Sequence, residues 1–338
     1  MTLWYQEIKI ILRLITWHKI KNYCLLVISF YLSRLLKKPI IWAYPYAVSI
    51  EPTTACNLGC PACPSGLKEF TRPTGNMKQE TFQKIFLSLK KYLLHINFYF
   101  QGEPLIHPKI FDYIHTASQN KVYTLISTNA HFLSKENCEK LIRSGLHKII
   151  ISIDGLTQEV YEQYRVNGNI DKVWEGIDNL REAKEKLQSK LPIIVLQWIV
   201  FEHNLHQLPA FIDYCKKQHL HYQIKTAQVY TIEQLQMLVP KHSKYSRYVR
   251  DDNHLKLKNT LDNHCWRMWA SCVFTIDGSI VPCCFDKDAK YSMGNIMGNH
   301  FSEIWTSPAY QTFRKNILHH RGSVDICVNC SEGSKVWV

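Results

Sequence analysis

The stretch Cys56-Asn57-Leu58-Gly59-Cys60-Pro61-Ala62-Cys63 places three thiols within eight residues, shortly after the apolar run Ala47–Ile50. Three thiolates at this C-x3-C-x2-C spacing can hold three irons of a four-iron cluster. The fourth iron then keeps an open coordination position, which distinguishes a reactive metal site from a structural one. A zinc knuckle that lacks its fourth ligand is the alternative explanation of the same cysteines.

The composition is that of a globular chain. It has 338 residues, enough for two domains or one large one, and 46% of them are hydrophobic. Seven of the twelve cysteines occupy metal-ligand spacings, which favours a reducing cytoplasm over a disulfide framework. The formal net charge of +13 would suit a nucleic acid, an anionic membrane or an acidic substrate. Because the basic residues are spread along the chain and no RNA-binding module is visible, a nucleic-acid partner is not expected.

The N-terminal segment, residues 1–43, combines apolar and basic side chains. Apolar residues recur at helical spacing between Trp4 and Ile15, and the apolar run 24–32 is shorter than the ~18 residues that a spanning helix needs. No small-residue cleavage site follows, so a signal peptide is not expected. Basic residues beside an apolar face favour contact with an anionic membrane surface through residues 1–40. A helix that caps the enzyme domain or binds a partner is the alternative.

From residue 47 to about residue 228, β-branched or aromatic runs alternate with amphipathic helical stretches. This alternation predicts six βαβ-type units around a parallel sheet, too few for a complete eight-unit barrel. Helices are predicted, for example, over Lys78–Tyr92, Lys135–Ser144 and Asp171–Lys190. The predicted strands are Ala47–Glu51, Asn97–Gln101, Val122–Ser127, Lys148–Ile153, Ile193–Phe201 and Tyr222–Thr226.

Polar segments follow these strands at their carboxyl ends, where parallel α/β proteins build their sites. The segment Gln101-Gly102-Glu103-Pro104 ends the second strand, Ser127-Thr128-Asn129 ends the third, and Ser152-Ile153-Asp154 ends the fourth. Each segment alone is weak evidence of a site. Their succession after a three-cysteine loop predicts one site at this edge of the sheet.

The loop and these strand ends together resemble the radical S-adenosylmethionine (SAM) enzymes, over roughly residues 44–230. The resemblance implies a partial (β/α)6 TIM-like barrel. It also implies that Cys56, Cys60 and Cys63 hold a [4Fe-4S] cluster whose open iron chelates the methionine part of SAM. In that family one electron from the cluster cleaves SAM to a 5′-deoxyadenosyl radical, which abstracts hydrogen from the substrate.

The resemblance assigns two SAM contacts to the end of the second strand. Gly102 and Glu103 correspond to the family's Gly-Gly-Glu-Pro motif, whose backbone and acid hold the SAM amino group. A carboxylate that faces an ammonium group is physically sensible. Gln101 replaces the first glycine of the motif, which leaves the backbone geometry there open.

Five further residues are assigned to SAM by the same resemblance. Ser127 and Asn129 resemble the family's ribose-contacting residues, and both can bond to hydroxyls. Ser152 and Asp154 would contact the SAM carboxylate or the ribose, or line the substrate side. Arg165 resembles an arginine that pairs with the SAM carboxylate, for which a guanidinium fork is suited.

A second group of cysteines lies near the C-terminus. It resembles the SPASM/twitch extension of radical SAM enzymes, in which C-x9–15-G-x4-C opens an auxiliary-cluster site around a glycine, here Gly278. The ligands implied are Cys265, Cys283, Cys327 and Cys330. Because the chain stops eight residues after the last of them, the shorter twitch form with one auxiliary [4Fe-4S] cluster is expected. A four-cysteine zinc site is the alternative, and Cys284 competes with Cys283 as a ligand.

Four segments are expected along the chain: an N-terminal helical segment 1–43, a radical SAM core 44–232, a linker 233–264, and an auxiliary-cluster domain 265–338. The resemblance implies a radical SAM oxidoreductase or maturase that oxidises or cross-links a peptide or carbohydrate-type substrate. It would take electrons from a donor such as flavodoxin or ferredoxin. The auxiliary cluster would accept the electron left on the product radical, relay reducing equivalents or help to shape the substrate pocket. No catalytic acid or base is assigned.

Two other hypotheses remain open from the sequence. One keeps the enzyme class and changes the substrate to RNA or lipid, which the positive charge would suit. The other is a non-catalytic, metal-stabilised scaffold that docks on a membrane or partner through residues 1–40. The expected location is the cytoplasm, at the inner face of the membrane if the N-terminal helices dock there.

Overall fold

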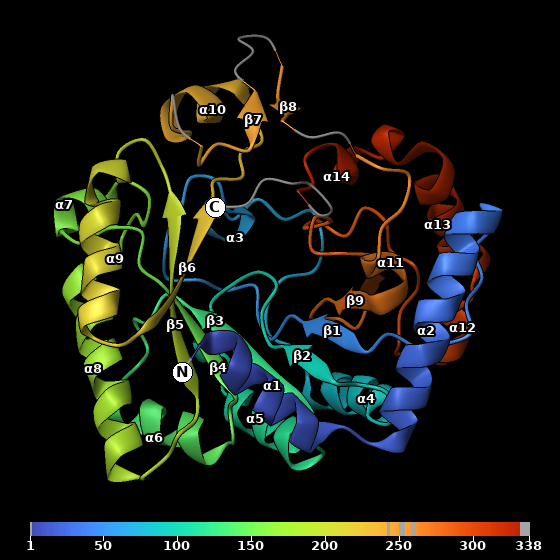
Figure 1. The fold of residues 1–338 in the computed structure, drawn as a ribbon, viewed down its shortest axis with the longest axis horizontal. Helices are drawn as coiled ribbons and strands as arrows, with labels where there is room; N and C mark the ends of the chain where they lie inside the picture. Colours follow the sequence, from blue (N-terminus) through green and yellow to red (C-terminus); the bar gives the residue numbers. More distant parts are fainter. Residues whose placement is uncertain (1, 242–243, 250–253, 259–260, 332–338) are drawn as a thin grey trace. The chain divides into compact units, whose positions relative to one another are not determined.

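The computed structural model describes residues 2–241, 244–249, 254–258 and 261–331 (Figure 1). The chain forms two compact units that do not follow its linear order. The first unit consists of the described residues in 1–55, 70–125 and 261–333, and the second of those in 56–69 and 126–260. The N-terminal helices and the second cysteine group therefore belong to the first unit, and the three-cysteine loop belongs to the second.

The first unit is built around parallel strands. β1 (Ala47–Ile50) pairs in parallel with β2 (His95–Asn97) and with β9 (Ser271–Phe274). β2 pairs in parallel with the first residues of β3 (Tyr123–Thr128), and β10 (Ile280–Val281) pairs antiparallel with β9. The sheet therefore places a strand from the C-terminal part of the chain directly beside the strand that leads into the three-cysteine loop.

Amphipathic helices complete the first unit. Phe82 and Tyr113, from two different helices, stack with their ring centroids 4.1 Å apart, and both are almost fully buried. The helices are α1 (Leu3–Leu14), α2 (Trp17–Leu36), α4 (Gln79–Leu89), α5 (Ile110–Gln119), α11 (Arg267–Ala270), α12 (Phe301–Trp305), α13 (Pro308–His320) and α14 (Asp325–Val328).

The main sheet of the second unit contains the end of β3 and the strands β4, β5 and β6. β5 (Ile193–Val200) pairs in parallel with both β4 (Lys148–Ser152) and β6 (His221–Thr226). β4 and β5 are nearly continuous apolar runs, as expected for strands that are covered on both faces. The helices of this unit are α3 (Pro64–Leu67), α6 (Lys135–Arg143), α7 (Gln158–Glu162), α8 (Ile170–Lys186), α9 (Leu208–Lys217) and α10 (Ile232–Leu238).

The predicted α/β class is confirmed, since strands β1 to β6 alternate with helices along the chain. Five of the six predicted strands match the observed bounds to within one residue. The second prediction is wrong, because β2 ends at Asn97, where the predicted strand Asn97–Gln101 begins. The aromatic residues after Asn97 have high β propensity. Phe98 still donates from its backbone to Leu125 (2.8 Å), but the chain then leaves the sheet toward Gly102.

The segment 233–264, which lacks a clear sequence pattern, has local structure where it is described. It contains most of α10 and a short antiparallel pair, β7 (Tyr248–Val249) with β8 (Lys256–Leu257). None of the helices in the described part of the chain has both the length and the apolar character needed to cross a bilayer.

Candidate functional site

The three-cysteine loop lies in the second unit. Cys60 is buried, whereas Cys56 and Cys63 are half-buried. The loop turns tightly, because the backbone of Cys63 donates to the carbonyl of Cys60 (3.2 Å). The backbone N–H of Leu58 points toward Cys56 Sγ at 3.5 Å. All three predicted ligands therefore lie on one short loop that is stabilised by its own hydrogen bonds.

Gly66, in the short helix α3, packs directly on the backbone of Cys60. A Cβ atom at position 66 would lie 2.5 Å from the nitrogen and 2.6 Å from the oxygen of Cys60. Backbone atoms cannot move aside as the tip of a flexible side chain can. Only glycine therefore allows α3 to lie this close to the central cysteine.

Asn129, directly after β3, orients the start of the loop. Its Nδ2 donates to Asn57 Oδ1 (2.8 Å) and lies 3.9 Å from Cys56 Sγ. Its Oδ1 accepts from the backbone N–H of His131 (3.1 Å). The side chain thus links the end of β3 to the first cysteine.

Asp154 and Arg165 form a buried ion pair beside Cys60. Arg165 Nε donates to Asp154 Oδ2 (2.8 Å), and its Nη1 lies 3.8 Å from Cys60 Sγ. The other oxygen of the completely buried Asp154 accepts from the backbone of Ile199, and Asn204 Nδ2 donates to the Asp154 carbonyl (3.0 Å). Burial opposes the charge of Arg165, but Asp154 and Cys60 outweigh it and raise the pKa of the guanidinium. Asp154 therefore holds a permanent cation against the central cysteine.

The loop packs against an apolar cluster within the same unit. Leu58 from the loop is buried in it, and Tyr164 packs on Phe201 with the ring centroids 4.1 Å apart. Other buried members are Ala62, Ala227, Val229, Leu235, Leu238, Val239 and Tyr248. Burial raises the pKa of the Cys60 thiol, although Arg165 opposes the shift. A thiolate at this depth needs additional positive charge, which a bound metal would supply.

Ser127 and Ser152 lie on β3 and β4, which are neighbouring strands of the sheet. Ser127 is half-buried near the end of β3, and Ser152 is buried as the last residue of β4. With Asn129, Asp154 and Arg165, they are the predicted SAM contacts that share a unit with the three-cysteine loop.

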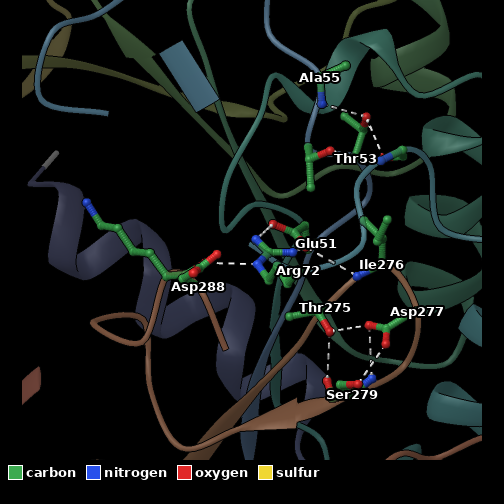
Figure 2. Close-up of polar contacts among 12 residues, drawn as sticks. Glu51, Thr53, Ala55, Arg72, Thr275, Ile276, Asp277, Ser279 and Asp288 are labelled. Atoms are coloured by element: carbon green, nitrogen blue, oxygen red, sulfur yellow. Dashed lines mark hydrogen bonds and ion pairs between the residues drawn. The ribbon is translucent and has the colours of Figure 1, made fainter. Parts of the chain in front are cut away.

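The chain on either side of the loop is fixed in the first unit by a buried ion pair (Figure 2). Glu51, directly after β1, accepts two hydrogen bonds of 2.7 Å from Arg72, which follows the loop. Burial raises the pKa of Glu51, and Arg72 opposes that rise. Arg72 Nε also donates to the Lys287 carbonyl (2.9 Å), and the backbone of Thr71 donates to Asp288 (2.8 Å). These contacts tie the exit of the loop to the segment that follows β10.

Gly102 and Glu103 also lie in the first unit. Gly102 has a left-handed φ of +72°, and a Cβ there would lie 2.3 Å from the carbonyl oxygen of Thr53. Because glycine occupies this position, the residue before it need not provide that flexibility. Glu103 is buried, its backbone donates to Ala55 (2.8 Å), and its Oε1 accepts from the backbone of Leu105 (3.1 Å). The motif is therefore rigidly held next to the strand that enters the three-cysteine loop.

The four predicted auxiliary ligands come together in the first unit. All four are buried: Cys265 before α11, Cys283 after β10, Cys327 in α14 and Cys330 just after it. Burial raises the pKa of Cys283, and the charges of Cys284, Cys265 and Cys330 raise it further. Burial also raises the pKa of Cys327 to about 12, with added contributions from Cys330 and Cys265. These mutual effects show that the sulfur atoms lie within electrostatic range of one another.

Arg321 is the cation of this second group. Its Nη2 lies 3.6 Å from Cys330 Sγ, and its Nη1 donates to the His264 carbonyl (2.9 Å). Burial lowers the pKa of Arg321, but the nearby cysteines outweigh burial and raise it. Cys284, in turn, interacts with Tyr99. Burial, together with this thiol, raises the pKa of Tyr99 to about 12.

The donor sets consist of thiols, which are the usual ligands of iron–sulfur clusters. Among the residues that the structure describes, no three Cys, His, Asp or Glu side chains lie close enough to bind one metal ion together. A zinc site would require four sulfur atoms at about 2.3 Å from one centre. In a four-iron cluster each sulfur binds a different iron, so wider separations are expected. Buried thiols, each group with an arginine nearby, fit such a cluster.

Sequence reasoning missed four residues of these sites: Asn57, Arg72, Glu51 and Arg321. Asn57 could have been found, since it is a polar side chain between two predicted ligands. The Glu51–Arg72 pair joins residues 21 positions apart with no local pattern. Arg321 lies six residues before Cys327, and only the fold shows that it turns toward the sulfur atoms.

Two family models match the chain. Residues 50–214 match the radical SAM superfamily, and residues 265–331 match SPASM, an iron–sulfur cluster-binding domain. The two matched ranges contain all seven cysteines predicted as ligands.

Known proteins resemble the chain over most of its length. It is 23% identical over 295 residues to the S-adenosyl-L-methionine-dependent 2-deoxy-scyllo-inosamine dehydrogenase of Niallia circulans, which covers 85% of this chain and 93% of the relative. It is 28% identical over 170 residues to the PqqA peptide cyclase of Bradyrhizobium diazoefficiens, which covers 50% of this chain and 43% of the relative. Its fold is similar to that of Streptococcus suis SuiB bound to S-adenosylmethionine, with a TM-score of 0.60, 15% identity, and coverage of 81% and 68% of the two chains.

Proposed function

Because the chain belongs to the radical SAM superfamily and carries an SPASM iron–sulfur domain, we propose that it is a dehydrogenase of a carbohydrate-type alcohol. It is a radical SAM enzyme, and SAM and [4Fe-4S] clusters are its cofactors. One observation supports the choice of substrate: the match to the 2-deoxy-scyllo-inosamine dehydrogenase spans nearly the whole of both chains.

In this proposal Cys56, Cys60 and Cys63 bind the SAM-cleaving cluster. When bound, this cluster supplies the electron that cleaves SAM into methionine and a 5′-deoxyadenosyl radical. The apolar cluster around Leu58 and Tyr164 keeps water away from the loop. Exclusion of water protects a reactive intermediate from side reactions.

The polar residues of the second unit orient the loop and SAM. Asn129 donates toward Asn57 and Cys56, so it positions the first ligand. Arg165, held by Asp154, offers its guanidinium to an anionic group near Cys60, such as the SAM carboxylate. Ser127 and Ser152 remain predicted hydroxyl contacts.

The first unit carries the two other predicted groups. Gly102 and Glu103 remain predicted contacts of the SAM amino group. Cys265, Cys283, Cys327 and Cys330 would bind one auxiliary [4Fe-4S] cluster. Such a cluster supplies a one-electron acceptor, which an alcohol oxidation requires after the first hydrogen has been removed. A flavodoxin or ferredoxin would provide the electron that starts each turnover.

The test uses anaerobically reconstituted protein reduced with dithionite. Aminocyclitols and sugars are supplied with deuterium at the carbinol carbon. We expect substrate-dependent 5′-deoxyadenosine that carries deuterium, and a carbonyl product. The variant Cys60→Ala, which lacks one cluster ligand, should form neither. Deuterium-free 5′-deoxyadenosine with every alcohol in the panel would contradict the dehydrogenase proposal.

A second candidate is modification of a peptide. It is supported by the match to the PqqA peptide cyclase, although that match covers half of the chain. In the same assay a peptide substrate, rather than any carbohydrate, would then stimulate 5′-deoxyadenosine formation. The two candidates therefore predict opposite results from one panel.

A further inference from the structure

Helix α2 buries one face and anchors it with polar groups. Asn22 exchanges two hydrogen bonds with the backbone of Tyr44 (2.8 and 3.0 Å), and Ser33 Oγ accepts from the backbone of Ile40 (2.9 Å). Phe30, on the same face, packs edge-on against Trp269 with the ring centroids 5.4 Å apart. These contacts fix which side of α2 points outward.

The outward side of α2 carries large apolar residues from its first turn to its last. Trp17, Ile20, Ile28, Tyr31 and Leu35, here called the α2 stripe, follow Trp17 by three, eleven, fourteen and eighteen positions. At 3.6 residues per turn these positions fall on one side of the helix. Trp17 is 72% exposed, Tyr31 58% and Leu35 77%. A soluble surface helix normally carries polar residues there.

The segments before and after α2 also carry exposed apolar side chains. Trp4 and Leu12 of α1 are exposed by more than half, as is Trp42, which follows α2. An exposed apolar patch of this extent marks an interaction site. Tryptophan and tyrosine are enriched where a protein meets the interface between membrane and water.

The charge of the same segment is predominantly positive. Residues 1–43 contain seven lysines and arginines and a single acidic residue, Glu7. α2 itself contains no acidic residue. Lys21 lies within one turn of the stripe, and Lys37 and Lys38 follow its C-terminal end. The buried Lys19 is used internally, donating to the carbonyls of Leu14 and Lys121.

We propose that α1 and α2 dock the enzyme on an anionic lipid surface, with the α2 stripe in the interfacial region and the lysines at the headgroups. Apolar burial and attraction to anionic lipids act together in such helices. A second copy of the chain fits less well, because two α2 helices would bring lysines and arginines together without an acidic partner. The proposal does not depend on the substrate of the enzyme.

The experiment measures binding of the full-length, reconstituted protein to sedimenting vesicles. Vesicles of phosphatidylcholine alone are compared with vesicles containing phosphatidylglycerol. The stripe variant is Trp17→Ser with Leu35→Ser, and the charge variant is Lys21→Gln, Lys37→Gln and Lys38→Gln. The matched control is Leu87→Ser with Met237→Ser, because these residues are 63% and 61% exposed on other helices.

We expect the stripe variant to bind anionic vesicles at least ~10-fold more weakly than the wild type, because it removes two large apolar side chains that the membrane would bury. The charge variant should lose the preference for anionic vesicles, and the control should bind as the wild type. All variants should retain SAM cleavage in solution. Equal binding of the stripe variant and the control would overturn the proposal. So would a stripe-dependent dimer in solution without vesicle binding, which would assign the stripe to a second copy.

Discussion

At the scale of single residues, the second unit's site depends on the pairing of Asp154 with Arg165. Two charges buried together lose much of their hydration, and their attraction compensates only when the remaining hydrogen-bonding groups are also satisfied. Here the backbone of Ile199 completes the carboxylate, and Cys60 faces the guanidinium. The pair therefore contributes more to positioning than to stability.

We expect Asp154→Asn to destabilise the protein by about 3 kcal/mol, because it leaves a buried guanidinium without its anion. It should also weaken SAM binding, since the guanidinium would no longer be held near Cys60. Denaturant unfolding of the metal-free protein measures the loss of stability. Equilibrium dialysis of the reconstituted protein with SAM measures the weaker binding.

The matched control is Asp213→Asn, which breaks the exposed ion pair with Lys217 on α9. Exposed pairs contribute about 0–1 kcal/mol, so this variant should resemble the wild type. Equal stability of the two variants would show that the buried pair does not hold Arg165 in place.

A second residue-scale prediction concerns Arg321. Its positive charge near Cys330 favours a reduced, more negative cluster. Arg321→Gln should therefore lower the reduction potential of the auxiliary cluster, whereas Arg321→Lys should restore most of it. A redox titration followed by electron paramagnetic resonance measures this shift. An unchanged potential in Arg321→Gln would contradict the electrostatic role.

Sequence reasoning identified Asp154 and Arg165 separately, each as a SAM contact. It did not predict that they pair, because the partners come from the end of β4 and from beyond α7. Cysteine spacing could be read directly because several ligands of one metal site lie close together in the sequence, whereas an ion pair across a fold leaves no such local pattern.

At the scale of elements, the three-cysteine loop is shaped by close packing as well as by its cysteines. α3 turns back on the loop, and Gly66 provides the room for this approach. The chain before and after the loop is held by Glu51 and Arg72 in the first unit (Figure 2). A loop restrained in this way needs little reordering when it binds a cluster.

Gly66→Ala should therefore impair cluster binding. The added methyl carbon would lie only 2.5 Å from the backbone nitrogen of Cys60, far closer than van der Waals contact allows. The loop must therefore shift. We expect reconstituted iron to fall from about eight to about four atoms per chain, as one of two four-iron clusters is lost. Iron and sulfide analysis measures it.

Gly298→Ala is the control, because among the described residues no atom beyond its chain neighbours lies within 4 Å of the Cβ that it would add. It should retain the iron content of the wild type. Full iron occupancy in Gly66→Ala would mean that the loop can yield without losing its ligand geometry.

The element that sequence reasoning placed wrongly has a physical explanation. The run after Asn97 is aromatic and suits a strand, but the chain must leave the ladder to bring Gly102 against the Thr53 carbonyl. A tertiary contact thus overrode local propensity. The five strands without such a demand were predicted closely.

At the scale of the whole molecule, the compact units combine segments that are distant in sequence. The parallel pairing of β1 with β9 joins the N-terminal and C-terminal parts of the first unit. Hydrophobic periodicity predicted that β1 is a strand, but it carries no information about which strand lies beside it. The grouping of segments could therefore not be obtained from the sequence.

The whole molecule also contains several buried histidines, which make stability depend on pH. Burial lowers the pKa of His147 to about 4, and it lowers the pKa of His107 and His203 as well. These imidazoles are neutral in the folded state, whereas the unfolded chain takes up protons near pH 6.5. Stability is therefore complete above about pH 6.5 and is lost as the pH falls toward 4.

We expect the free energy of unfolding of the metal-free protein to fall by roughly 3 kcal/mol from His147 alone between about pH 6.5 and 4. Urea unfolding at about pH 7.5, 6.5 and 5.5 measures how the free energy of unfolding changes with pH, before most carboxylates titrate. His147→Gln should flatten this dependence on pH, because it removes the imidazole that takes up a proton when the chain unfolds. His115→Gln, at an exposed position on α5, is the control for the substitution itself. Stability that rises on acidification across this window would contradict the assignment of neutral, buried imidazoles.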